Sequence, residues 1–247
     1  MKKLFFKLLM VTLFAVVTLI PTFVMGDTVT VFKGPDLNNL YRTTDSITYP
    51  PPIPTWSGEY ILQPSTELLW AINYFSDSTR NQLTYRNSFN AFCLEMSESV
   101  FSGQTYNAIL NNKAIMGGIG PSGDPLSIGS AYLFNQFRLG VLSGYTYTPS
   151  PDRAISAANL QYAVWWLENE TNEPANNPFV TMVKGLFVDP KADNNGAYPI
   201  GVLNLYTLEG GLAQDFMVPI PEPATMLLLG SGLLGIGVYV RRRFRKN

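Results

Sequence analysis

The chain has 247 residues, of which 17 are Lys or Arg, 18 are Asp or Glu and none is His. Without histidine it cannot build a Ser-His or Cys-His nucleophile pair or the usual zinc site. Residues 27–220 carry nine basic and 17 acidic side chains, and this net charge of −8 argues against a nucleic-acid partner.

The first 26 residues predict a secretory signal peptide. Three lysines precede a long apolar run, which ends with Val24 and Gly26 before a cleavage point at Asp27. An uncleaved N-terminal membrane anchor is the alternative. Cleavage is favoured because nothing basic follows the run as a stop signal.

The next segment, residues 27–58, is expected to form an extended, proline-rich lead-in with little structure of its own. The domain is expected to span residues 59–218, with strands early and late and helices between. This order predicts an α+β fold in which β-strands pack with a small helical bundle. In the first half of the domain, the patterns predict a strand at 59–63, a helix at 65–75 capped by Ser65 or Thr66, and one or two strands within 83–96. A loop is expected at 113–125. Three helices are then expected at 126–145, 150–170 and 177–187, and two final strands at 198–209 and 212–220.

Cys93, the only cysteine, lies in an apolar stretch that reads as a strand, where side chains alternate between two faces. Ala91 shares the face of Cys93, whereas Phe92, Leu94 and Met96 share the other face. The small neighbour leaves room for a group to approach the thiol. A buried free cysteine that serves only as a small hydrophobic residue is the alternative.

Gln161 lies on the apolar side, or at its edge, of the helix predicted at 150–170. A buried carboxamide must find partners for its donors and its carbonyl oxygen, or it destabilises the fold. Attack of the Cys93 sulfur on this carboxamide, with loss of ammonia, would form an internal thioester between strand and helix. A glutamine that simply caps or bonds to backbone is the alternative.

Two short motifs around these residues resemble the paired motifs of the thioester domains of bacterial surface adhesins. The first motif there is an aromatic residue, cysteine, an apolar residue and an acid, and here it is Phe92, Cys93, Leu94 and Glu95. The second motif is glutamine, any residue, alanine, an apolar residue and tryptophan, and here it is Gln161, Tyr162, Ala163, Val164 and Trp165. The family usually has threonine before the glutamine, where this chain has Leu160.

The resemblance implies a thioester-domain-like fold with a Cys93–Gln161 crosslink and no catalytic residues, cofactor or metal. An amine on a target surface would attack the Gln161 carbonyl carbon and displace Cys93, once per molecule, so the protein would not be an enzyme. Trp165 and Trp166 would either shield the bond from water or serve as core aromatics.

Two other classes of function remain open from the sequence. One is a non-covalent structural or polysaccharide-matrix binding protein without a thioester, which would use surface aromatics such as Trp56, Tyr145 and Tyr147. The other is an enzyme that acts on polysaccharide through paired carboxylates. The clustered carboxylates that could serve such an enzyme are better interpreted as the solvated end of a helix. They are Glu168, Glu170 and Glu173.

The last 29 residues, 219–247, combine three features in a fixed order. Pro221, Glu222 and Pro223 precede an uncharged apolar segment at 224–240, which predicts a transmembrane helix. A basic cluster follows and favours the cytoplasmic side; it consists of Arg241, Arg242, Arg243, Arg245 and Lys246.

This order resembles the PEP-CTERM sorting signal of Gram-negative bacteria that make extracellular polysaccharide. The resemblance implies that an exosortase, a membrane transpeptidase, recognises the tripeptide and processes the chain nearby. The protein would cross the inner membrane, be held there by the helix, and then reach the cell surface or the extracellular matrix.

Overall fold

The computed structural model describes residues 27–33, 58–72, 87–115, 123–148, 150–221 and 231. The predicted signal peptide, most of the lead-in with Trp56, the residues Glu222 and Pro223, the apolar segment 224–240 apart from Ser231, and the basic tail lie outside these residues. Within the described ranges, no helix has the length and apolar character needed to cross a membrane.

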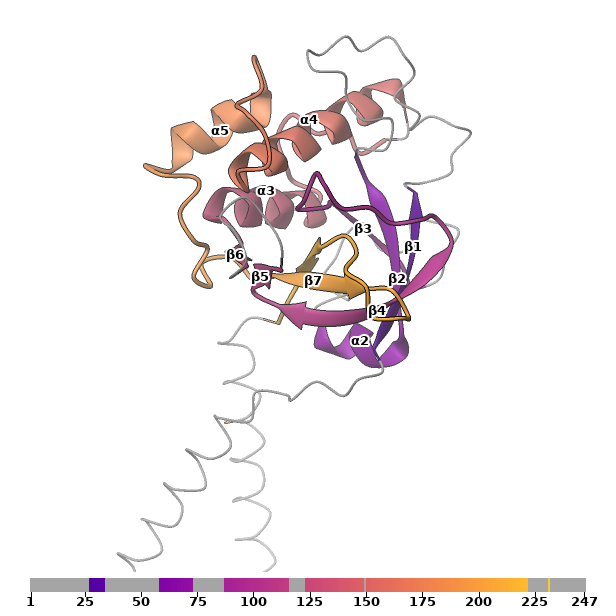
Figure 1. Cartoon of the computed structure of the whole chain (residues 1–247). Coiled ribbons are helices and arrows are strands. Elements are labelled where there is room, and N and C mark those ends of the chain that lie inside the picture. The colour runs from indigo at the N-terminus through magenta and orange to yellow at the C-terminus, as the bar shows by residue number, and fades with distance from the viewer. Residues whose placement is uncertain are drawn as a thin grey trace, which may run out of the picture.

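Six strands form one antiparallel sheet with the order β3-β2-β1-β4-β7-β8, and two short strands pair separately (Figure 1). The six are β1 (Thr28–Lys33), β2 (Tyr60–Pro64), β3 (Phe89–Ala91), β4 (Gln104–Asn111), β7 (Ile200–Tyr206) and β8 (Phe216–Pro219). The separate pair is β5 (Lys113–Ala114) with β6 (Asp124–Pro125).

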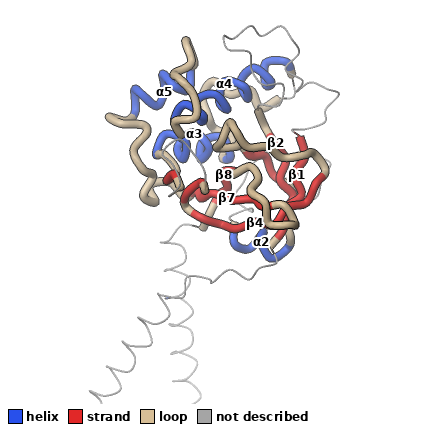
Figure 2. Tube along the Cα trace, in the orientation of Figure 1, coloured by secondary structure: helices blue, strands red, loops and turns tan. Residues whose placement is uncertain are grey.

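Three helices lie together on one side of the sheet, and a short helix lies at its far end (Figure 2). The three are α3 (Ile128–Arg138), α4 (Pro151–Leu167) and α5 (Pro178–Leu186), and the short helix is α2 (Thr66–Ala71). Each begins at a residue whose side chain caps it, and of the two caps expected for α2, Ser65 or Thr66, the structure shows Ser65. The capping residues are Ser65, Ser127, Ser150 and Asn177. The α+β class is therefore confirmed.

The two ends of the six-stranded sheet approach each other, so that the sheet nearly closes into a barrel. Cys93, just after β3, forms an antiparallel bridge with Phe216 in β8. Leu94 N donates to Asp215 O at 2.9 Å, and Met217 N donates to Phe92 O at 3.2 Å. We call this junction of residues 92–94 with residues 215–217 the seam.

The seam separates two apolar clusters. Ala91 and Cys93 belong to one cluster with Phe216, whereas Phe92 and Leu94 belong to the cluster that the three helices cover. The predicted alternation is confirmed for these residues. It was wrong for Met96, which is 45% exposed, because regular pairing ends at Ala91 and the chain turns away after the single bridge at Cys93.

Several element boundaries differ from the sequence-based expectations. The segment 27–33, assigned to the lead-in, forms β1, which pairs with both β2 and β4 in the middle of the sheet. The loop expected at 113–125 contains β5 and β6. Helix α3 ends at Arg138 rather than near residue 145, because Gly140 adopts a positive φ of 76° that a helix cannot continue.

Candidate functional site

Helix α4 directs the Gln161 carboxamide at the backbone and the thiol of Cys93. The Cys93 thiol donates to Gln161 Oε1 at 3.2 Å, and the Cys93 backbone N–H donates to the same oxygen at 3.2 Å. Gln161 Nε2 donates to the Cys93 carbonyl oxygen at 2.7 Å. Gln161 is fully buried and Cys93 is 2% exposed, so this is a dry site in which the carboxamide is hydrogen-bonded at both ends.

Local sequence explains why α4 reaches this place. Ser150 caps the helix by accepting from Arg153 N, and Pro151 occupies the first turn, where its missing N–H costs nothing. The helix then runs without interruption to Leu167, and Gln161 lies on the side that packs against the seam. The other half of the site depends on the β3–β8 junction, which brings Cys93 to the helix.

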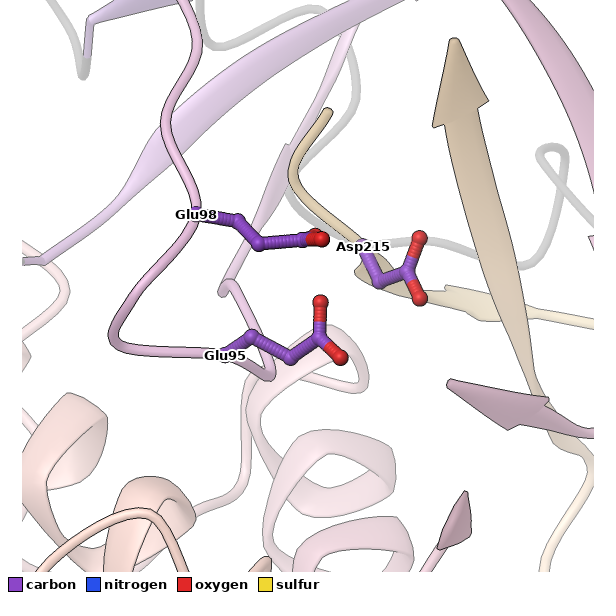
Figure 3. Close-up of side chains that lie close together, drawn as sticks. All are labelled: Glu95, Glu98 and Asp215. Carbon is purple, nitrogen blue, oxygen red and sulfur yellow. The ribbon is translucent and has the colours of Figure 1, made fainter. Parts of the chain in front are cut away.

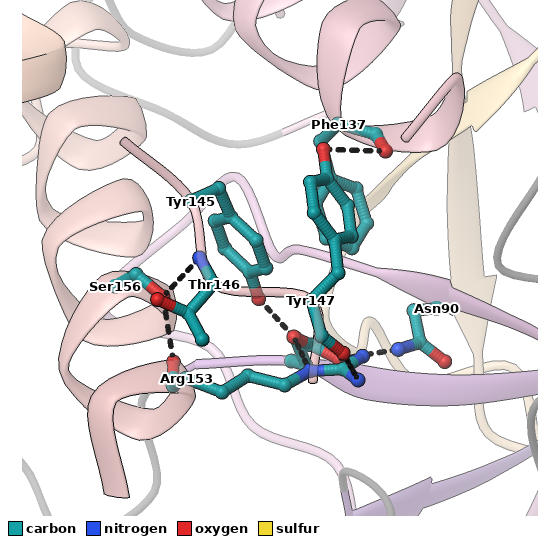
Figure 4. Close-up of polar contacts among 8 residues, drawn as sticks. Asn90, Phe137, Tyr145, Thr146, Tyr147, Arg153 and Ser156 are labelled. Carbon is teal, nitrogen blue, oxygen red and sulfur yellow. Dashed lines mark hydrogen bonds and ion pairs between the residues drawn. The ribbon is translucent and has the colours of Figure 1, made fainter. Parts of the chain in front are cut away.

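A buried polar cluster fixes the first turn of α4 to the sheet (Figure 4). The Glu59 carboxylate accepts from Arg153 Nε and Nη2, both at 2.9 Å, and also from the Tyr145 hydroxyl and Asn90 Nδ2. Glu59 is 4% exposed and Arg153 is 2% exposed. Removing one partner would leave the other charge buried and unpaired, so this ion pair holds the first turn of α4 against the residue before β2.

The same cluster corrects the interpretation of two aromatic residues as surface platforms. Tyr145 is only 7% exposed, and its hydroxyl donates to Glu59. Tyr147 is half-buried, and its hydroxyl donates to Phe137 O at 3.1 Å. Both rings pack against Phe137, so they belong to the core and not to a carbohydrate-binding face.

The surroundings of Cys93 keep its thiol neutral. Burial raises the pKa of this thiol to about 12, the side chains of Gln214 and Trp165 act in the opposite direction, and the Glu95 carboxylate adds to the increase. Trp165 packs in the same apolar cluster as Cys93 and is 4% exposed.

Trp166, by contrast, lies in the other apolar cluster, where the ammonium of Lys191 is 4.8 Å from its ring. Of the two tryptophans considered as a cover for Cys93, only Trp165 shares its cluster. The remaining motif residues are buried core positions beside the pair: Phe92, Leu94, Ala163 and Val164.

Glu95, the acid of the first motif, is 2% exposed and faces two other carboxylates, Glu98 and Asp215 (Figure 3). Burial raises the pKa of Glu95 to about 10, and the nearby acids add to this shift. Burial also raises the pKa of Asp215 to about 7. Sequence reasoning missed the cluster because Asp215 is far from the other two along the chain.

The three glutamates interpreted as a solvated helix end have three separate environments. Glu168 is 5% exposed and accepts from Ser127 Oγ at 2.7 Å, so the interpretation was wrong for this residue. Glu170 accepts from Met96 N at 3.0 Å, and Glu173 pairs with Lys184 at the surface. Each carboxylate has its own structural partner, which does not favour a pair that works on one substrate.

Residues 219–243 match the PEP-CTERM protein-sorting motif. The chain matches no curated protein and no solved structure. The matched motif implies an exported protein that an exosortase, a membrane enzyme, recognises and processes, with membrane anchoring through the C-terminal region and then display at the surface. The match begins at Pro219, the last residue of β8, so the domain runs directly into the sorting signal.

Proposed function

We propose that this chain is an exosortase-sorted surface protein whose Cys93 and Gln161 condense to an internal thioester, which then attaches the protein once to an amine on a target surface. The observation that carries the proposal is the 3.2 Å distance between Cys93 Sγ and Gln161 Oε1. The carbonyl carbon is one C=O bond from that oxygen, so it lies no more than about 4.4 Å from the sulfur. Such proximity lowers the entropic barrier to bond formation.

Formation of the thioester bond uses only chemical groups of Cys93 and Gln161. The sulfur attacks the Gln161 carboxamide carbon, and the negative charge that develops on Oε1 is met by the Cys93 backbone N–H, which already donates to it. The thiol proton moves to the amide nitrogen, the C–N bond breaks and ammonia leaves. Because the thiol proton ends on ammonia, no outside base is consumed.

In the reaction with a target, the Cys93 sulfur becomes the leaving group instead of the attacking group. A target amine attacks the same carbonyl carbon, the C–S bond breaks, and a proton from the amine passes to the departing sulfur. The product is an amide bond between Gln161 and the target, with Cys93 as a free thiol again. Burial of both side chains slows hydrolysis before a target arrives, because water is excluded from the carbonyl carbon.

The test is intact mass. The full-length chain, purified in detergent, should be lighter than its processed sequence by one ammonia, and Cys93→Ala should remove this deficit apart from the mass of the substitution. Methylamine should add to the wild-type chain and not to Cys93→Ala. Gln136→Glu is the matched control, because Gln136 lies in α3 away from the site and its loss should leave the deficit unchanged.

A second candidate function, a non-covalent structural or matrix protein, is favoured by one specific observation. The Gln161 carboxamide is already satisfied by the backbone N–H and carbonyl of Cys93, so it can serve as a purely structural link between α4 and the seam. This candidate predicts full mass, no methylamine uptake, and a thiol that reacts with maleimide once the protein is unfolded. That result would overturn the thioester.

A further inference from the structure

Three carboxylates converge beside the seam, and the mechanism above does not use them. Glu95 and Glu98 come from the segment after β3, and Asp215 comes from the residue before β8. One oxygen from each lies within 4.8 Å of the other two. In Figure 3 the Glu95 and Glu98 side chains extend toward Asp215 from one side.

Glu95 is the unusual member of this group. It is 2% exposed, and its carboxylate oxygens have no hydrogen-bond donor among the described residues apart from the carboxyl group of Glu98, which is itself a member of the cluster. The charged groups that act on it are other acids, namely Asp215, Glu98 and Glu170. The ion pairs Arg153–Glu59 and Lys184–Glu173 use carboxylates elsewhere. A buried carboxylate with no donor is costly unless a cation or a proton neutralises it.

From the convergence of these three side chains and the unpartnered, buried Glu95 that points into it, we infer that Glu95, Glu98 and Asp215 bind one calcium ion. Calcium–oxygen distances are about 2.3–2.6 Å, so two ligands on opposite sides of one ion are up to roughly 5 Å apart. The 4.8 Å limit fits this span. Magnesium, with bonds of about 2.1 Å, demands a near-ideal octahedral shell, whereas calcium accepts irregular sets of oxygen ligands such as these.

A calcium site also needs fixed ligand orientations and access for water, and the residues around the three carboxylates provide both. Asp215 Oδ2 accepts from Ile115 N and from Asn204 Nδ2, both at 2.8 Å, which fixes the orientation of this carboxylate. Glu98 is half-buried, so water can reach the ion on its side and complete the coordination shell. Gln214 Nε2 donates to Glu95 O at 2.5 Å and holds the Glu95 backbone against the residue before Asp215.

The position of the ion gives it a structural role. Glu95 lies two residues after Cys93, and Asp215 precedes Phe216, the bridge partner of Cys93. A bound cation would therefore connect the two chain segments that close the barrel.

The experiment is a calcium titration of the full-length chain in detergent, after treatment with EDTA and removal of the chelator. Calorimetry should show one calcium ion per chain with a Kd of about 10⁻⁴–10⁻³ M, the range of extracellular modules, and calcium should raise the melting temperature more than magnesium does. Glu98→Gln should weaken calcium binding about tenfold or more, because it removes one charged ligand. Glu98 is the variant of choice because it is the least buried of the three ligands.

Glu209→Gln is the matched control, since Glu209 is an exposed acid in the turn between β7 and β8. It should bind calcium as the wild type does. Cys93→Ala should also bind, because the sulfur is not a ligand, so the result does not depend on whether the thioester forms. No calcium binding at about 10 mM, or equal binding by wild type and Glu98→Gln, would overturn the site.

Discussion

At the scale of single residues, the polar side chains of both candidate sites stand out because all but Glu98 are buried. Cys93 and Gln161 could be singled out from the sequence because each breaks a local pattern: a single cysteine in an apolar stretch, and an amide on the apolar side of a helix. The hydrogen bonds between Cys93 and the Gln161 carboxamide show that these two residues are in direct contact. The group of Glu95 with Asp215 could not be predicted, because long-range strand pairing alone brings them together.

Glu168 provides a prediction at this scale. Burial raises its pKa to about 7 from an ordinary value of 4.5, against the hydrogen bonds from Ser127, while Asp124 adds to the increase. The folded state therefore binds this proton more tightly than the unfolded state does. The stabilisation is complete below pH 4.5 and is lost as the pH rises through about 7. The ammonium of Lys191 also faces Glu168 and opposes part of this loss.

We expect Glu168→Gln to remove this pH dependence, because an amide keeps the acceptor for Ser127 and carries no charge. Between pH 4.5 and about 7, the wild type should lose up to about 3 kcal/mol of unfolding free energy relative to the variant. Urea unfolding of both proteins across this range measures the difference. Glu173→Gln, at an exposed ion pair, should have little effect, and parallel curves for wild type and Glu168→Gln would refute the assignment.

At the scale of elements, the helices were predicted better than the strands. A helix has local sequence signals, namely a capping residue, an apolar period and a residue that ends it. Ser65, for example, was expected as a cap and is the cap of α2. Strands β1 and β4 were missed. The alternation in residues 28–33 is short and follows the apolar run of the predicted signal peptide, and β4 is largely polar on its outer face. What makes them strands is pairing with distant partners, which no local window contains.

The close approach of α3 to Leu167 and Pro190 gives a prediction for Gly129. A Cβ on Gly129 would lie 2.6 Å from a Leu167 methyl carbon and 2.7 Å from Pro190 O, which is backbone and cannot move easily. Gly129→Ala should therefore destabilise the fold by about 1–3 kcal/mol, although alanine favours helix.

Gly185→Ala in α5 is the matched control, since nothing lies within 4 Å of the added methyl group. It should stabilise the fold by up to about 1 kcal/mol through helix propensity. Thermal unfolding of both variants measures the contrast. If Gly129→Ala were as stable as Gly185→Ala, the close approach of α3 to Leu167 and Pro190 would be wrong.

At the scale of the whole molecule, the class of fold could be predicted and the closure of the sheet could not. Early strands, middle helices and late strands predict α+β, but the order β3-β2-β1-β4-β7-β8 follows from contacts between the two ends of the domain. The seam depends on a single bridge between Cys93 and Phe216, so no run of alternating residues reveals it.

The proposed crosslink predicts a stability difference for the whole domain. Its two residues are 68 positions apart, and closing a loop of this size restricts the unfolded chain by about 4 kcal/mol in the chain-entropy account of covalent crosslinks. Methylamine, which opens the bond, should therefore lower the melting temperature by roughly 10 °C. Methylamine-treated Cys93→Ala should show no change, and an unchanged wild type would contradict the crosslink.

The overlap of the sorting motif with the last residue of β8 has a mechanical consequence. Ile220 N still donates to Pro199 O at 2.9 Å, one residue beyond the end of the strand at Pro219, where the sorting motif has already begun. Tension applied to the chain through Pro221 would act directly on β8. The tension would load the hydrogen bonds that join β8 to β7 and to the Cys93 segment, so these few bonds would set the force at which the tether yields.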